Sequence, residues 1–185
     1  MSELSREADA QLDVQLIARW KQGDQRAATE IVERHAQALA RFAATHGGRD
    51  AVDELVQDTF VRAFNSIESF RADSSLRTWL FTILKRLMLD RQRSERRSRN
   101  SVELEDDHVV QEFNALDGMV ADETLMRVQR AVARLSPLQR EVFTLRVSEG
   151  LPYVDIARIV ESTEGACRVH YHNAMRAVKE YLSDD

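Results

Sequence analysis

Apolar side chains recur three and four positions apart along almost the whole of this chain, and no other feature constrains its fold as strongly. That spacing places them on one face of an α-helix, as for Val52, Leu55, Val56 and Phe60. Only six glycines and two prolines interrupt 185 residues, which favours long helices over a turn-rich β fold. The sequence therefore predicts an all-α protein.

Helix boundaries are marked most clearly in the last third of the chain. Ser136 precedes Pro137, and Gln139 follows three positions after Ser136, which is the pattern of a capping box with proline in the first turn. A shorter helix and a tight turn come next, and either Ser162 or Thr163 is positioned to cap a final helix. This order of elements is the outline of a helix-turn-helix.

Charge is distributed unevenly, although the net charge is only −5. Residues 85–99 hold seven basic and two acidic side chains, whereas residues 100–124 hold eight acidic ones and no lysine or arginine. The acidic stretch has weak periodicity, which is typical of a flexible linker. We therefore expect two helical lobes, at 12–98 and 118–183, joined by an acidic flexible linker at 99–117.

Several function classes receive no support from the sequence. It has no phosphate-cradling glycine loop, no nucleophile elbow and no spaced set of metal ligands, so we expect neither an enzyme nor a bound cofactor. A single cysteine fits a reducing compartment, and we find neither a signal peptide nor an apolar run long enough for a membrane span. A cytoplasmic location is therefore expected.

The final helix is expected to bury one face. The residues of that face are spaced by 4, 3, 4 and 4 positions, and they are Cys167, Tyr171, Ala174, Val178 and Leu182. A metal ion bound through Cys167 is not expected, because His172 lies further round the helix. His35, set between two apolar positions, is expected to be a core residue and not a metal ligand.

The opposite face of the final helix holds donors, acceptors and one small apolar group. Its members are Arg168, Val169, His172, Asn173 and Arg176. Such a set can contact base edges and phosphates if the helix enters the major groove of DNA. On these residues alone, a helical hairpin that only packs against another lobe remains the alternative.

Two longer stretches carry a resemblance to a known family. They are "AVDELVQDTFVRAFNSIESFRADSSLRTWLFTILKRLMLDRQR" and "LSPLQREVFTLRVSEGLPYVDIA". Together they resemble the extracytoplasmic-function (ECF) sigma factors of bacterial RNA polymerase, in the sigma-70 family, and the resemblance runs from about Leu16 to Leu182. It implies a sigma-2-like helical bundle followed by a sigma-4-like helix-turn-helix. The implied function is to bind core RNA polymerase and to direct promoter-specific transcription initiation.

The resemblance also implies which residues meet each partner. The family's docking surface for a coiled coil of the largest polymerase subunit corresponds to Asp53, Glu54, Gln57 and Asp58. The family's reader of the −10 element in the melted strand corresponds to Phe70, Arg71, Ser74, Ser75, Arg86, Asp90, Arg91 and Arg93. Aromatic and cationic side chains suit single-stranded DNA. The outward face of the final helix corresponds to the family's reader of the −35 element. For the helix that carries the four docking residues, the alternative is a charged face that only meets solvent.

The final helix departs from the family pattern, which usually reads "GTVKSRLHRAR". Gly165 and Arg168 match that pattern, whereas His170 and Asn173 do not, so an altered −35 preference is expected. One rival function is a two-lobed helix-turn-helix regulator that does not engage polymerase, and another is a scaffold that sequesters a regulator. Family members are commonly held by an anti-sigma protein, which makes one a candidate partner. We also hypothesise that the two lobes mask each other from DNA in the free protein.

Overall fold

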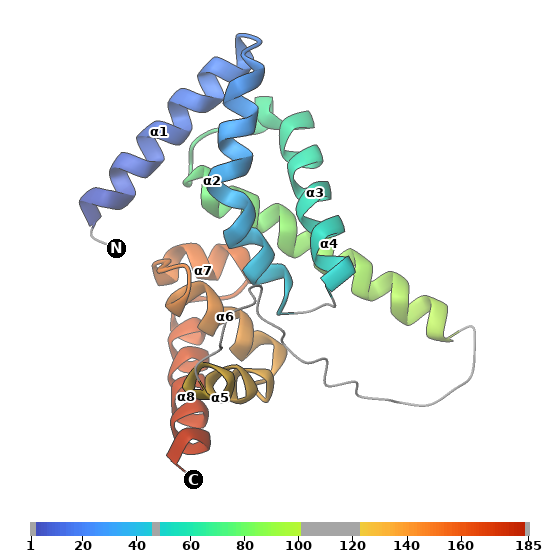
Figure 1. Cartoon of the computed structure of the whole chain (residues 1–185), viewed down its shortest axis with the longest axis vertical. Coiled ribbons are helices and arrows are strands. Elements are labelled where there is room, and N and C mark those ends of the chain that lie inside the picture. The colour runs from blue at the N-terminus through green and yellow to red at the C-terminus, as the bar shows by residue number, and fades with distance from the viewer. Residues whose placement is uncertain (1–2, 46–48, 101–122, 184–185) are drawn as a thin grey trace.

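The regular elements of the described chain are all helical. A computed structural model describes residues 3–45, 49–100 and 123–183, and Figure 1 shows their arrangement. The N-terminal lobe consists of α1 (Glu3–Lys21), α2 (Gln25–Ala43), α3 (Arg49–Asn65), the 3-10 helix η1 (Ile67–Ser69) and α4 (Leu76–Asn100). The C-terminal lobe consists of α5 (Glu123–Ala133), α6 (Pro137–Val147), α7 (Tyr153–Ile159) and α8 (Glu164–Ser183). The all-α prediction and the prediction of two lobes are confirmed.

The N-terminal lobe is built from two helix pairs that share one apolar core. α1 packs along α2, and α3 packs along α4. Phe42 and Phe81 are fully buried and meet edge to face, with ring centroids 5.4 Å apart. Burying each aromatic or aliphatic side chain of this size stabilises the fold by about 1.5–3 kcal/mol. His35 is also buried, and its Nε2 lies 3.1 Å from Asp13 Oδ1, so the prediction of a core histidine is confirmed.

Two helices of the C-terminal lobe, α6 and α8, begin where their capping residues predict. The Ser136 hydroxyl accepts a hydrogen bond from the backbone N–H of Gln139, whose side chain accepts one from Ser136 N–H in return. Thr163, and not Ser162, caps α8, because its Oγ1 accepts from the backbone N–H of Ala166 at 3.1 Å. These caps fix the directions of α6 and α8, and both helices pack against each other.

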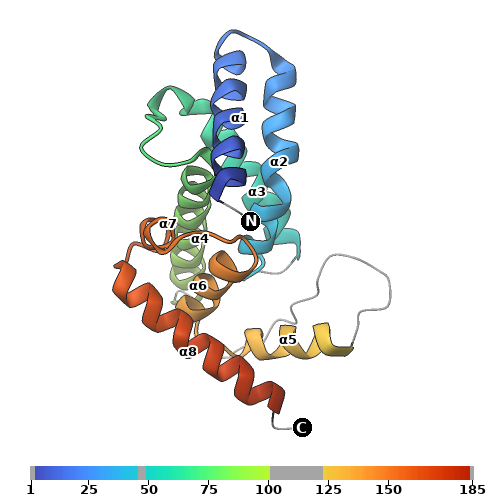
Figure 2. The same cartoon turned by 90° about the vertical axis from the view of Figure 1, so that its left-hand side faces the viewer.

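The two lobes lie against each other. α7 packs on α4, and α6 packs on the end of α2, as Figure 2 shows from the side. Buried residues of the C-terminal lobe, including Leu145 and Ile156, belong to the same apolar cluster as Leu80 and Phe81 of the N-terminal lobe. A second, smaller cluster lies within the C-terminal lobe and includes Val132, Phe143 and Ala174. The helix-turn-helix is therefore seated on the N-terminal lobe.

The predicted linker falls almost wholly outside the described residues. α4 continues to Asn100, two residues beyond the predicted end of the first lobe, and the next described residue is Glu123. The boundaries at 12–98, 99–117 and 118–183 remain predictions. α1 begins at Glu3, whereas the apolar stripe marks a helix only from about Leu16.

Candidate functional site

The acidic helix presents its predicted partner-binding residues to solvent. Asp53, Glu54, Gln57 and Asp58 are all exposed on α3, while Val52 and Leu55 on the opposite side are buried. Of the four, Glu54 is joined to α4, since Arg91 donates a hydrogen bond from Nη1 to its carboxylate at 2.6 Å. A shallow hollow between α3 and α4 is lined by Glu54, Asp58 and Arg91 among others. The face is open to a partner that carries cations.

The loop before α4 uses part of its predicted −10 set to hold itself together. The Phe70 ring is half-buried and lies against Trp79, with ring centroids 5.2 Å apart. The Ser75 hydroxyl caps α4, accepting from the backbone N–H of Thr78 at 3.1 Å. Arg71 is exposed, and Ser74 is half-buried. Within this loop, Arg71 is therefore the cation that is available to DNA. The Phe70 ring would have to move away from Trp79 to stack fully on a base.

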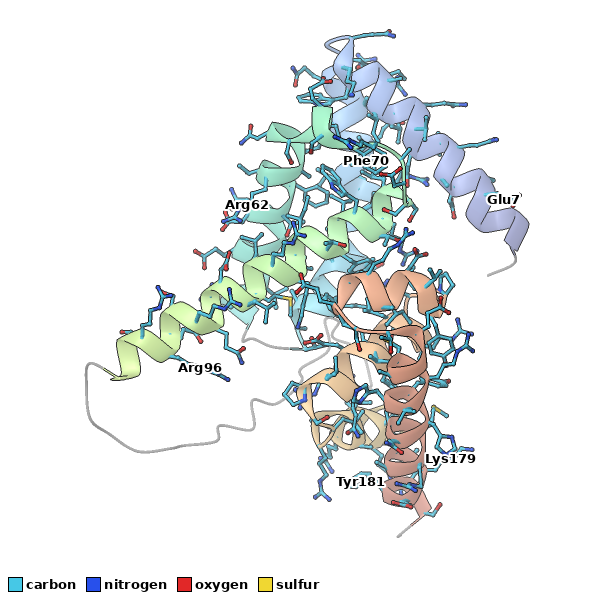
Figure 3. The ribbon with its side chains drawn as sticks, turned by 180° about the vertical axis from the view of Figure 1, so that it is seen from behind. Glu7, Arg62, Phe70, Arg96, Lys179 and Tyr181 are labelled. Carbon is cyan, nitrogen blue, oxygen red and sulfur yellow. The ribbon has the colours of Figure 1, made fainter. Side chains whose placement is uncertain are left out.

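The basic half of α4 extends beyond the rest of the N-terminal lobe, and Figure 3 shows Arg96 on this extension. Arg86, Asp90 and Arg93 are exposed, whereas Arg91 is half-buried between two carboxylates. Arg91 donates to Glu54 and to Glu95. These hydrogen bonds raise the pKa of Arg91 above its ordinary value, and the bond to Glu54 has the larger effect. Exposed cations on a projecting helix suit a phosphate backbone.

The helix α8 shows the two faces that its sequence predicts. Cys167 and Ala174 have no exposed surface, and Val178 is 6% exposed. On the outward face Val169 is 58% exposed. Arg168, His172 and Arg176 on that face are exposed, and Asn173 is half-buried. The face of α8 that is expected to meet DNA is thus exposed although the lobes are packed together. The hypothesis that the lobes cover each other's expected DNA faces is wrong for this helix.

Two arginines of the outward face make only weak, solvent-exposed contacts within the protein. The Arg168 guanidinium lies 4.6 Å from the Tyr153 ring centroid and 3.5 Å from the Glu164 carboxylate. Arg176 lies 3.9 Å from Glu180. Exposed ion pairs of this kind contribute about 0–1 kcal/mol to stability, so a DNA phosphate can replace the glutamate as the partner of each arginine. Cys167 is buried whereas His172 is exposed, so the two side chains do not converge on one metal ion. The described residues hold no group of three or more metal-ligating side chains.

Two buried carboxylates form a feature that the sequence interpretation missed. Glu141 and Glu149 of the C-terminal lobe are 1% and 3% exposed. Both pair with cations of the N-terminal lobe, which are Arg41, Arg77 and Lys85. Glu141 could have been found from its helical register, because it stands between Leu138 and Leu145 on the apolar stripe of α6. The sequence around Glu149 carries no comparable signal.

Comparison with known proteins matches each lobe separately. Residues 31–98 match the family described as Sigma-70 region 2, and residues 125–178 match the one described as Sigma-70, region 4. The RNA polymerase sigma factor NccH of Alcaligenes xylosoxydans xylosoxydans is 30% identical over 158 residues, covering 80% of this chain and 83% of that protein. The ECF RNA polymerase sigma-E factor of Haemophilus influenzae is 28% identical over 184 residues, covering 95% of this chain and 97% of that protein.

Solved structures agree with this result over both lobes. The sigma factor RpoE of Bartonella quintana, in complex with the anti-sigma factor NepR, matches with a TM-score of 0.69 at 27% identity, over 85% of this chain and 97% of that one. CnrH, in complex with the cytosolic domain of CnrY, matches with a TM-score of 0.66 at 28% identity, over 96% of this chain and 99% of that one. The fold and the two regions together define a promoter-directing sigma factor of RNA polymerase. The chain belongs to the sigma-70 family, in its ECF group.

Membership of this family sets the rival functions aside. Sigma factors are initiation factors without catalysis of their own, and they act with core RNA polymerase on promoter DNA. A helix-turn-helix regulator that never meets polymerase is therefore not favoured. Within the described residues, no helix is both long and apolar enough to cross a bilayer.

Proposed function

We propose that this sigma factor divides promoter recognition between its two lobes. The loop 70–75 and α4 read the −10 element in the melted strand, and α8 reads the −35 element in the major groove. The observation that carries the proposal is the division of α8 into a closed inner face and an open outer face, with Cys167 and Ala174 unexposed and Val169 58% exposed. A recognition helix needs such an outer face to reach base edges.

Core polymerase docks, in this proposal, on the acidic face of α3. Asp53, Glu54, Gln57 and Asp58 offer three carboxylates and one amide on a rigid helix. A basic coiled coil of the largest polymerase subunit is the complementary partner, since charge complementarity speeds and orients association. The basic half of α4 lies beside this face, so docking on α3 holds the −10 reader next to the polymerase.

The test is run-off transcription with purified core polymerase. The template should carry a promoter selected from genomic fragments by the reconstituted holoenzyme. The expected result is a transcript that needs both core and this protein. A protein that binds DNA but gives no such transcript, and does not co-purify with core, would return the chain to the class of polymerase-independent regulators.

An anti-sigma protein is the further partner that we propose. The solved relatives RpoE and CnrH are each in complex with a partner, which for RpoE is named as the anti-sigma factor NepR. Both matches extend over most of this chain, which supports the proposal of a partner of the same kind. We place the protein in the cytoplasm, because core polymerase and promoter DNA are there. Affinity purification of the tagged chain from its own cells tests for the anti-sigma partner, and recovery of core polymerase alone would contradict it.

A further inference from the structure

The contact between the lobes contains a buried carboxylate held by two guanidinium groups. The Glu149 side chain has no exposed surface. Arg41 of α2 donates from Nε to Glu149 Oε1 at 2.7 Å and from Nη2 to Oε2 at 3.2 Å. Arg77 of α4 donates from Nη2 to Oε2 as well. Both donors belong to the N-terminal lobe, whereas Glu149 follows α6 in the C-terminal lobe.

A second carboxylate repeats the arrangement. Lys85 of α4 donates from Nζ to Glu141 Oε1 at 2.6 Å, and the two side chains are only 12% and 2% exposed. A buried charge is tolerated while it is paired, but removal of its partners leaves it uncompensated. The packed arrangement of the lobes therefore depends on Arg41, Arg77 and Lys85 in a way that an apolar contact alone does not.

Two hydrogen bonds to backbone carbonyls add to this contact. Arg140 donates to the carbonyl of Thr45 at 3.0 Å, and Arg158 donates to the carbonyl of Asp73 at 2.9 Å. Asp73 lies in the loop of the proposed −10 reader, and Arg158 lies on the first helix of the helix-turn-helix. The −35 lobe is thus bonded directly to the −10 loop.

Simultaneous reading of both promoter elements requires the lobes to separate. Elements at −10 and −35 are about 25 base pairs apart, or about 85 Å along B-DNA at about 3.4 Å per pair. A C-terminal lobe hydrogen-bonded to the −10 loop cannot also contact DNA at that distance. The chain between Asn100 and Glu123 has 23 peptide steps and can reach about 75 Å when extended. Together with the lengths of α4 and α8, this reach is enough for the separation.

We propose that Glu149 and Glu141 form a latch that keeps the free protein closed by occupying Arg41, Arg77 and Lys85. The inference rests on the proposed division of promoter recognition between the lobes. Two of the three cations lie on α4, the helix that carries Arg86 and Arg91 toward DNA. Opening the latch therefore frees the cations of α4 and releases the −35 lobe in one step.

Small-angle X-ray scattering of the free protein tests the latch. Glu149→Gln keeps the shape of the side chain and removes its charge, and Arg41→Gln removes a partner that is 40% exposed, so neither variant should unfold the protein. Both should raise the radius of gyration by several ångströms at fixed ionic strength, with helix content by circular dichroism unchanged. Glu68→Gln is the matched control, because Glu68 pairs with Lys21 within one lobe and is 81% exposed.

A charge exchange separates the latch from simple loss of stability. Lys85→Glu and Glu141→Lys should each open the protein, and the double variant should return the radius of gyration toward the wild-type value. Unchanged radii for both Glu149→Gln and Arg41→Gln would overturn the latch. Run-off transcription by the wild-type chain reports on the proposed function independently, so a latch that fails leaves that function standing, and the reverse also holds.

Discussion

Arg91 donates a hydrogen bond to the Glu54 carboxylate over 2.6 Å, which joins a residue proposed to meet DNA to one proposed to meet polymerase. The two side chains are 39% and 63% exposed. An exposed pair contributes about 0–1 kcal/mol to stability, so another molecule can bind either side chain in place of its partner. If polymerase takes up Glu54 as proposed, Arg91 loses one of its two carboxylate partners and keeps only Glu95, so a phosphate can replace Glu54.

Arg91→Ala should therefore weaken holoenzyme binding to single-stranded −10 DNA without weakening the attachment to core. Loss of one phosphate contact should reduce the slope of log K against log salt by about 0.7. Fluorescence anisotropy of a labelled non-template oligonucleotide over a salt series measures this slope. Arg62→Ala is the matched control, since Arg62 is an exposed arginine of α3 outside the proposed DNA set. Equal slopes for both variants would remove Arg91 from the DNA-binding set.

Reversal of charge on α3 should abolish association with polymerase. In the double variant Asp53→Arg with Asp58→Arg, two exposed carboxylates become cations that repel a basic coiled coil. Co-purification with core should be lost while the circular dichroism spectrum stays unchanged. The control is Glu33→Arg with Glu68→Arg, which reverses two exposed carboxylates elsewhere in the same lobe. If the α3 variant retains core at the wild-type level, docking occurs on another surface.

Cys167 should react slowly with thiol reagents in the folded protein. Burial of its side chain raises the pKa of the thiol above its ordinary value, so less thiolate is present at pH 8 than in a free thiol. Because Cys167 is the single cysteine, the colour yield with a disulfide reagent reports on it alone. The reaction should accelerate by at least about ten-fold in denaturant, and its pH midpoint should fall. Equal rates in the folded and denatured protein would place Cys167 at the surface.

The turn of the helix-turn-helix stores strain at Glu161. Its φ of 52° lies in the left-handed region, where a residue with a Cβ costs about 1–2 kcal/mol. Glu161→Gly should leave stability equal or higher, although glycine offsets part of the gain by loosening the unfolded chain. Glu161→Val should lower the free energy of unfolding by more than about 1 kcal/mol, because β-branched side chains tolerate this region worst. Urea denaturation measures both, and a stable valine variant would contradict the strained geometry.

Local features of this fold could be predicted from the sequence because each depends on residues close together in the chain. Thr163 caps α8 through a hydrogen bond to Ala166, three positions away. The capping box at Ser136 and the inward position of Cys167 are likewise short-range consequences of backbone geometry and helical spacing. The family resemblance predicted the order of the lobes, whereas the partner-binding surfaces that it implies remain predictions.

The packing of the lobes could not be predicted in the same way. Glu149 and Arg77 are 72 positions apart, and no spacing rule relates residues at that separation. A buried glutamate and a solvated one look alike in sequence unless, as for Glu141, helical register places the carboxylate on an apolar stripe. The N-terminal half of α1 was missed for the opposite reason, because residues 3–11 hold too few apolar side chains to show a stripe.

Asn173 should read one base of the −35 element. It lies half-buried beside exposed His172 on the outer face of α8, and an asparagine amide can pair with both N6 and N7 of adenine. Asn173→Ala should cost about 1–3 kcal/mol at that position and little elsewhere. Selection of a randomised −35 library with wild-type and variant holoenzymes measures the preference, and the expected result is loss of preference at one position. Lys179→Ala, an exposed change farther along α8, should leave every preference intact. Identical preferences from wild type and Asn173→Ala would mean that this part of α8 packs and does not read DNA.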